Sequence, residues 1–148
     1  MRIDVIPLLA QWHFKQWGNL TGASTEHGYK ALLFGNAFNQ NLPLTLIAVS
    51  GKRLLGSVNV VDCDMDIRPE LKPWLAQLYV AVPERNRGIG SMLVRAAIER
   101  SRKLAFSCLY LYTSGTLPVF YEHLGWTRRE TVHYKDKARI VMEMRLFG

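Results

Sequence analysis

Apolar residues recur along this chain at spacings that separate strands from helices. Alternating or continuous apolar runs predict strands at residues 2–6, 44–50, 53–62, 74–82, 107–113, 128–134 and 139–147. Apolar residues three and four positions apart predict helices at residues 7–18, 24–38, 89–104 and 116–124. No repeat or linker interrupts this order. We therefore expect one α/β domain over residues 1–148, with a mixed central sheet flanked by helices.

Residues 78–94 hold the clearest single pattern, a strand followed by a loop and a helix. The β-branched and aromatic run of the strand stops at Pro83, which has no N–H group for a strand ladder. The loop at residues 85–90 reads Arg-Asn-Arg-Gly-Ile-Gly and leads straight into the helix. The helix is expected to bury a stripe formed by Ile89, Met92, Leu93, Ala96 and Ala97.

This loop has the features of an anion site. The first turn of a helix leaves backbone N–H groups unpaired and carries a partial positive charge. Gly88 and Gly90 have no side chain to keep a bulky anion away, while Arg85 and Arg87 add positive charge. A basic loop that only caps a helix can look similar, but the strand, arginines and amphipathic helix together favour a pyrophosphate cradle. The loop lacks the Gly-Lys-Ser/Thr of a nucleotide P-loop and the third glycine of a dinucleotide site.

Two ordered motifs resemble the GNAT superfamily of acetyl-coenzyme A-dependent N-acyltransferases. The family's cofactor loop, Arg/Gln-x-x-Gly-x-Gly/Ala after a strand, matches Arg85, Gly88 and Gly90. Further along, residues 120–126 read Phe-Tyr-Glu-His-Leu-Gly-Trp and are similar to the family's Phe-Tyr-x-x-Leu-Gly-aromatic segment. The resemblance covers roughly residues 44–147 and implies the GNAT-like acyl-CoA N-acyltransferase fold.

The resemblance also implies a cofactor and the residues that bind it. Acetyl-CoA is the expected co-substrate, with no metal ion. In the family the cofactor strand separates from its neighbour after a bulge, which assigns the pantetheine contacts to the backbone of Val80 and Val82, and a contact with the acetyl carbonyl to one of these amides. The pyrophosphate is expected on Arg85, Asn86, Arg87, Gly88, Ile89, Gly90 and Ser91.

Tyr121 lies where the family's tyrosine acid stands. A thiol of pKa ~8.5 leaves more easily when a proton is supplied, and a tyrosine of pKa ~10 can supply one at neutral pH. A tyrosine in this place also fits a core aromatic with a hydrogen-bonded hydroxyl, but the motif context favours the acid. We therefore expect acetylation of a primary amine of a small molecule by direct attack, with Tyr121 as the general acid.

The sequence departs from the family at the general base. Many members carry a Glu on the cofactor strand, where this chain has Ala76 beside Gln77, or on the next strand, where it has Tyr112. The asparagine that often contacts pantetheine is absent, with Ser114 and Thr116 nearby. Deprotonation in solvent, through a water chain or at another group all stay open. The other groups are Asp62, Asp64, Asp66, His27, His123 and His133.

The three aspartates follow one another at every second position, so an extended backbone would place them on one face. A calcium loop would need Gly and Glu where this chain has Ile67 and Pro73, so that interpretation fails. We expect a solvated strand end. The functional alternative is an acidic lip that attracts a cationic amine.

Composition narrows the partners and the compartment. The net charge is +7, but the basic residues are scattered, so we expect no nucleic-acid partner; a polyanionic ligand such as CoA explains part of the excess. No apolar run approaches the ~20 residues of a membrane span. There is no secretory signal pattern, and the two cysteines lack metal-ligand spacing and are expected to be reduced and partly buried. These observations predict that the protein is cytoplasmic, and we expect a monomer or a homodimer.

Two alternatives to a small-molecule acetyltransferase stay open. One is acetylation of a protein or peptide amine, and the other is a CoA-binding regulatory module without turnover, which the missing base permits. In the family the helical pair that corresponds to residues 7–18 and 24–38 forms one wall of the acceptor site, and acceptor contacts come from variable helices and loops.

Overall fold

The computed structural model describes residues 42–147, so the predicted strand at 2–6, the helices at 7–18 and 24–38, and His27 lie outside the described residues. The described chain forms six strands in one sheet, two α-helices and a short 3₁₀ helix. In chain order these are β1 (Leu44–Ser50), β2 (Arg53–Val61), β3 (Trp74–Val80), η2 (Val82–Glu84), α3 (Ile89–Lys103), β4 (Cys108–Thr113), α4 (Leu117–His123), β5 (Thr127–Tyr134) and β6 (Lys137–Arg145).

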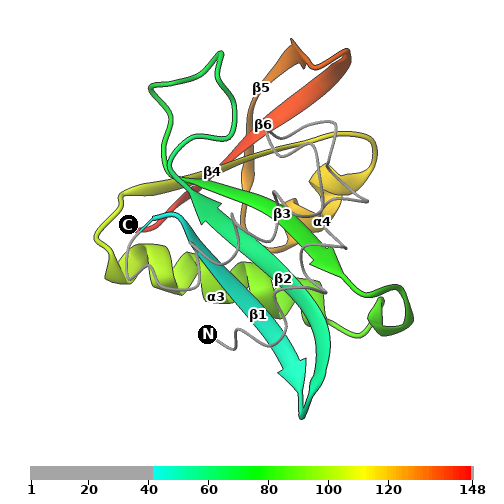
Figure 1. Ribbon diagram of the computed structural model, residues 1–148. Helices are drawn as coiled ribbons and strands as arrows, with labels where there is room; N and C mark the ends of the chain where they lie inside the picture. Colours follow the sequence, from blue (N-terminus) through cyan, green and yellow to red (C-terminus); the bar gives the residue numbers. More distant parts are fainter. Residues whose placement is uncertain (1–41, 148) are drawn as a thin grey trace.

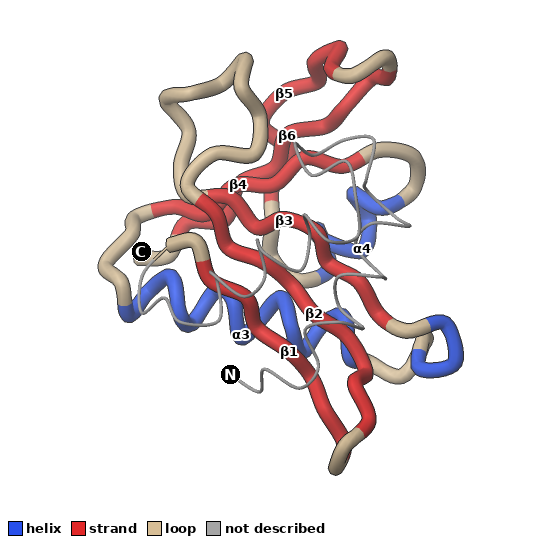
Figure 2. Tube along the Cα trace, in the orientation of Figure 1, coloured by secondary structure: helices blue, strands red, loops and turns tan. Residues whose placement is uncertain are grey.

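The predicted mixed sheet is confirmed. Its strand order is β1-β2-β3-β4-β6-β5, and only the β3–β4 pair is parallel. Helix α3 crosses one face of β1, β2 and β3, whereas α4 lies beside β5 near the other half of the sheet (Figures 1 and 2). The sheet is therefore two antiparallel halves joined by a single parallel pair.

The buried face of α3 differs from the predicted stripe. Its first residue, Ile89, agrees with the prediction, but Met92 is 59% exposed and Ala96 is exposed, while Val94 is fully buried. Helical periodicity marks the line of Ile89, Leu93 and Ala97 correctly. The periodicity does not show whether the residues on one side of this line or on the other are buried, because that depends on how the helix packs against the sheet.

The two halves of the sheet separate almost at once. Trp74 pairs with Tyr110, and the described residues form no further ladder between β3 and β4. Further along β3 a bulge shifts the register against β2, and Gln77 within it has a φ of 56°. Figure 1 shows the resulting divergence, in which β3 runs toward η2 while β4 runs toward α4. The structure thus contains the separation and the bulge that the resemblance implies.

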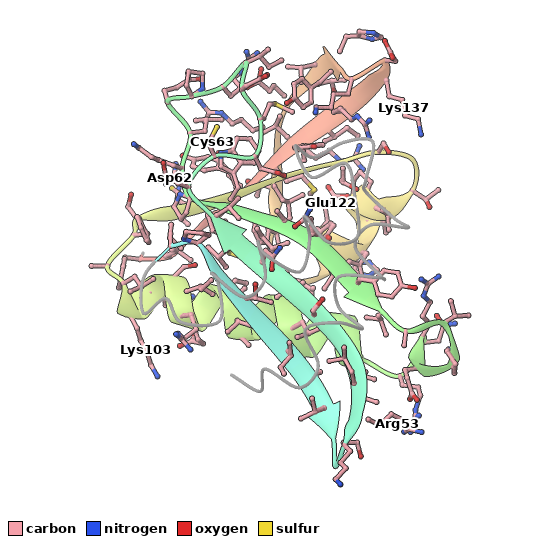
Figure 3. All side chains as sticks on the ribbon, viewed as in Figure 1. Arg53, Asp62, Cys63, Lys103, Glu122 and Lys137 are labelled. Atoms are coloured by element: carbon pink, nitrogen blue, oxygen red, sulfur yellow. The ribbon has the colours of Figure 1, made fainter. Side chains whose placement is uncertain are left out.

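Several strand ends differ from the predicted ones. Strand β3 ends at Val80 rather than Val82, because Pro83 brings residues 82–84 into a 3₁₀ turn. Strand β2 ends at Val61, and Asp62 and the exposed Cys63 lie in the loop that follows it (Figure 3). Strand β6 begins two residues earlier than predicted, at Lys137. None of the helices in the described part of the chain is both long and apolar enough to cross a membrane.

Candidate active site

Two cavities meet where β3 and β4 diverge. The first, which we call the loop cavity, has a volume of about 450 Å³ and lies against the end of β3, the loop after it and the start of α3. The second, the cleft cavity, has a volume of about 380 Å³ and lies between β3, β4, α4 and the start of β6. Leu78 and Leu117 line both. One elongated ligand can therefore pass from one cavity into the other between these two leucines.

The loop cavity gathers most of the residues predicted to bind the cofactor. Its lining includes Val80, Arg85, Asn86, Gly88, Ile89, Gly90 and Ser91. Phe120 and Leu117 from α4 complete the opposite wall, and neither was predicted from the sequence. Two predicted residues, Val82 and Arg87, are not part of the lining. Val82 is 65% exposed on η2, where it follows the end of the strand rather than belonging to it.

Arg87 has a different partner, the carboxylate of Glu84. Glu84 is 5% exposed, and its oxygens lie 2.6 Å from Nη1 of Arg87 and 3.3 Å from Nη2 of Arg53. Because a buried carboxylate needs compensating charge, the two arginines hold the loop through Glu84 and tie it to the β1–β2 hairpin. Sequence reasoning missed this role, since an acidic residue beside a proline in a basic loop is ordinary surface composition.

The two glycines of the loop serve different needs. Gly88 has a φ of 81° and stands at the N-cap of α3, a left-handed conformation that favours glycine. A Cβ atom on Gly90 would instead lie 3.6 Å from the ring of Phe120 and 3.8 Å from Val80, which are ordinary contacts inside the loop cavity. A larger side chain at Gly90 would therefore extend into the loop cavity, directly at the first turn of α3.

Arg85 is folded back onto the end of β3. Its Nε atom donates to the carbonyl oxygen of Val80 at 2.9 Å, and its guanidinium lies 5.4 Å from the centre of the Tyr79 ring. The side chain is exposed and lines the loop cavity. It therefore supplies positive charge at the cavity edge, while it occupies one backbone carbonyl that sequence reasoning assigned to pantetheine.

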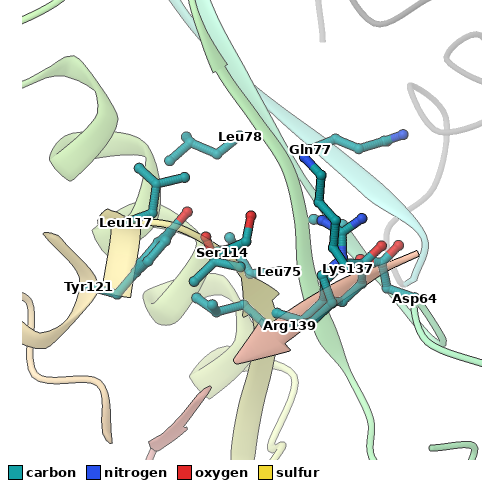
Figure 4. Close-up of a pocket in the computed structure, with 13 residues that line it drawn as sticks. Asp64, Leu75, Gln77, Leu78, Ser114, Leu117, Tyr121, Lys137 and Arg139 are labelled. Carbon is teal, nitrogen blue, oxygen red and sulfur yellow. The ribbon is translucent and has the colours of Figure 1, made fainter. Parts of the chain in front are cut away.

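Tyr121 stands in the cleft cavity close to the junction with the loop cavity. The side chain is 7% exposed and packs edge-on against Phe120 and Trp126. In Figure 4 its ring extends from α4 toward Leu117, on the same side as Leu78. No described residue forms a hydrogen bond with its hydroxyl, and burial raises its pKa to about 12. The group stays protonated over the ordinary pH range and can act only as a proton donor there.

The two positions without the family's carboxylate also line the cleft cavity. Ala76 and Tyr112 face it, and Gln77 lies beside them. The Gln77 side chain is held from β2, because its Oε1 accepts a hydrogen bond from Asn59, whose own Oδ1 accepts one from Thr45. The amide of Gln77 is therefore positioned by a chain of hydrogen bonds across three strands, and it carries no basic group.

Of the three alternating aspartates, only Asp64 lines the cleft cavity. The loop after β2 is not an extended strand, so the condition under which the three aspartates would share one face is not met; Asp62 and Asp66 are exposed. Asp64 keeps partial contact with solvent but is surrounded by protein, which raises its pKa to about 7, while Lys135 opposes the rise. Asp64 therefore does not fit the expectation of a solvated strand end. His123 and His133 are exposed and line neither cavity.

Two basic residues of β6 complete the cleft cavity, and sequence reasoning missed both. Lys137 and Arg139 stand two positions apart on one strand and both line the cavity, as the pleat allows. The predicted strand at residues 139–147 left Lys137 outside the sheet, whereas β6 begins at Lys137. In Figure 4, Asp64, Lys137 and Arg139 lie on one side of the cavity, and Tyr121 and Leu117 on the other.

Comparisons with known proteins agree with this geometry. The protein-family model described as the acetyltransferase (GNAT) family matches residues 6–126. A ribosomal-protein-alanine N-acetyltransferase from Brucella melitensis has a TM-score of 0.75 at 17% identity, over 98% of this chain and 96% of that one. An aminoglycoside 6′-N-acetyltransferase complexed with coenzyme A gives 0.74 at 16% identity, over 98% and 92%. The aminoglycoside 6′-N-acetyltransferase from Enterococcus faecium gives 0.72 at 17%, over 99% and 93%. No curated protein matches the sequence.

Proposed function

The chain belongs to the GNAT acetyltransferase family and is an acetyl-CoA-dependent N-acetyltransferase, and on this premise we propose that it acetylates a primary amine of a small molecule, with Tyr121 as the general acid. The observation that carries the proposal is the junction of the two cavities at Leu78 and Leu117. It joins an anion-binding helix start to a buried tyrosine that has no described hydrogen-bond partner.

In this proposal acetyl-CoA spans both cavities, with its pyrophosphate at one end and its thioester at the other. Its pyrophosphate lies in the loop cavity, against the first-turn N–H groups of α3 that Gly88 and Gly90 leave accessible. The pantetheine arm follows the edge of β3, which has no ladder partner in β4 beyond Trp74 among the described residues. The thioester then enters the cleft cavity between Leu78 and Leu117, close to the hydroxyl group of Tyr121.

The chemistry proceeds by direct attack. The neutral amine of the acceptor forms a bond to the thioester carbon, and the carbon–sulfur bond of the tetrahedral intermediate then breaks. Tyr121 donates its proton to the departing sulfur and recovers one that the amine nitrogen loses, through solvent. Because its pKa is about 12, Tyr121 begins every cycle protonated.

The size of the cleft cavity supports a small acceptor. At about 380 Å³ it lies at the lower end of the range of small-molecule sites, about 300–1,000 Å³. The alternative is a protein or peptide acceptor, as the name of the Brucella melitensis neighbour indicates for that protein. Because the two chains are 17% identical, their likeness shows the same fold and does not extend to the acceptor.

The test incubates the full chain with acetyl-CoA and a panel of small amines and terminal peptides while free thiol is measured. Small amines should release thiol faster than peptides at equal concentration. Faster release with peptides would favour the protein-directed alternative. Tight calorimetric binding of acetyl-CoA without amine-dependent release would support a regulatory module instead.

A further inference from the structure

Arg139 is a buried cation that has no partner carboxylate among the described residues. The residue is 8% exposed, yet it lines the cleft cavity. Its Nε donates to the carbonyl oxygen of Tyr134 at 3.0 Å, its Nη2 donates to that of Lys135 at 3.4 Å, and its guanidinium lies 5.8 Å from the centre of the Tyr112 ring. Among the described residues, none forms an ion pair with it and none accepts a hydrogen bond from Nη1.

Anchoring the β5–β6 turn explains only part of this arrangement. The two carbonyl bonds use one edge of the guanidinium, and a neutral donor could make them. A buried charge is costly unless an anion compensates it, and the remaining edge of an arginine is a fork that matches a carboxylate. Lys137 adds a second positive charge at the same end of the cavity.

The nearby carboxylate of Asp64 does not neutralise this pair. It forms no ion pair with Arg139 or Lys137, and Lys135 is the cation that most influences it. Asp64 and Arg139 both act electrostatically on Tyr112, which places the two charges around one ring. Above pH 7, where Asp64 is ionised, one end of the cavity therefore presents two cations and one carboxylate, a pattern complementary to a zwitterion.

We propose that the acceptor is an α-amino acid whose side chain ends in a primary amine. Its carboxylate binds Arg139 and Lys137, its α-ammonium faces Asp64, and its side-chain amine reaches across the cavity to the thioester near Tyr121. The proposal rests on the proposed function, because it names the acceptor class for the same site. The opposite positions of Tyr121 and the charged end in Figure 4 favour a distant amine over the α-amine.

Four acceptors of matched length test the proposal. Lysine carries both head groups, 1,5-diaminopentane lacks the carboxylate, 6-aminohexanoate lacks the α-amine, and pentylamine lacks both. With hydrogen bonds to charged groups contributing about 1.5–3 kcal/mol, lysine should exceed 1,5-diaminopentane by ~10–100-fold in kcat/KM. Equal or better use of 1,5-diaminopentane or pentylamine overturns this proposal, whereas no thiol release with any amine overturns the proposed function instead.

Three variants separate recognition from folding. Lys137→Gln, at an exposed site, should lower kcat/KM for lysine ~5–10-fold more than it lowers kcat/KM for pentylamine. Arg139→Lys keeps the charge but loses the fork, and it should lower kcat/KM for lysine more than Lys137→Gln does. Arg145→Gln removes an exposed charge at the far end of β6 and is the control. If a variant loses kcat/KM equally on lysine and pentylamine, its residue has a structural role and the proposal is contradicted. If Arg139→Lys does not fold, the Lys137 variant and the comparison of the four acceptors still test the proposal.

Discussion

The loop cavity and the cleft cavity share two leucines but are built by opposite means. The loop cavity takes most of its lining from one continuous stretch, residues 78–91, which includes the start of α3. The cleft cavity takes side chains from the loop after β2, from β3, β4 and α4, and from the start of β6. The loop cavity suits the cofactor, which is the same throughout the family, and the cleft cavity suits the acceptor, which differs from one enzyme to another.

The contrast also appears in the electrostatics. In the loop cavity the buried carboxylate of Glu84 is compensated by two arginines. In the cleft cavity, Asp64 and Tyr121 have pKa values raised by burial, and Arg139 has no described counter-ion. Ionisable groups with shifted pKa values gather at functional sites, which supports the proposal that chemistry and acceptor recognition take place in the cleft cavity.

The largest effect should follow from filling the loop cavity. Gly90→Val places a branched side chain where we propose that the phosphate binds, and losing hydrogen bonds worth about 1.5–3 kcal/mol each should weaken acetyl-CoA binding at least ~10²-fold. The variant should fold, because a Cβ at Gly90 meets only ordinary contacts. Gly88→Val should also abolish binding, but the φ of 81° adds backbone strain there. Calorimetry with Ala96→Val, at an exposed site of α3, is the matched control; unchanged affinity of Gly90→Val would displace the phosphate from this site.

The next effect should come from the cleft cavity alone. Tyr121→Phe removes the proton donor, so turnover should fall by ~10²-fold or more, while the dissociation constant of acetyl-CoA stays within about twofold. Tyr110→Phe, on β4 and outside the lining of both cavities, should keep its activity. Steady-state kinetics and calorimetry on the same preparations give both quantities. Full turnover by Tyr121→Phe would remove this residue from the mechanism.

The difference in construction explains what could be predicted from the sequence. The loop cavity is local, so glycine spacing and helix periodicity predict the start of α3 correctly, and the predicted Arg85, Gly88 and Gly90 all line this one cavity. Their contacts with the cofactor stay a prediction. The cleft cavity depends on how distant segments meet. The acid role of Tyr121 is predicted through the family motif, but Lys137 and Arg139 were missed because no local pattern says which face of β6 lines the cavity.

Sequence reasoning also failed where burial changes a residue's role. Asp64 alternates with Asp62 and Asp66, and nothing in the sequence distinguishes the one aspartate that lines the cavity. Val82 continues an apolar run, yet Pro83 ends the strand before it. In both cases the outcome depends on a turn, whose geometry is set by a few dihedral angles rather than by hydrophobic period.

The raised pKa of Asp64 predicts that ionising this residue of the cleft cavity lowers the stability of the folded protein. Between pH 4 and 7 the folded protein keeps a proton that the unfolded chain has lost, so stability falls as pH rises through this range. A change from 3.8 to about 7 corresponds to about 4 kcal/mol, which partial solvent contact reduces to about 2–3 kcal/mol. Asp64→Asn should therefore be more stable than the wild type by that amount at pH 8.5 and similar to it at pH 4.

Urea unfolding at both pH values measures this difference. Asp62→Asn, in the exposed part of the same loop, is the control and should follow the wild type at each pH. If the wild type and Asp64→Asn lose or gain stability in parallel between pH 4 and 8.5, the Asp64 carboxyl is not the group that titrates there.

The smallest effect concerns two arginines that look equivalent in the sequence but differ in their contacts. Arg85→Ala should weaken acetyl-CoA binding ~5–10-fold and leave the melting temperature unchanged, because its side chain is exposed and lines the loop cavity. Arg87→Ala should lower stability by about 1 kcal/mol, since Glu84 keeps Arg53 but loses its nearer partner. Its effect on affinity should be threefold or less. In a Glu84→Gln background the stability loss from Arg87→Ala should shrink, because no buried charge is left to compensate. An Arg87 variant of normal stability that binds acetyl-CoA as weakly as the Arg85 variant would place Arg87 on the phosphate after all, and would make the two arginines alike.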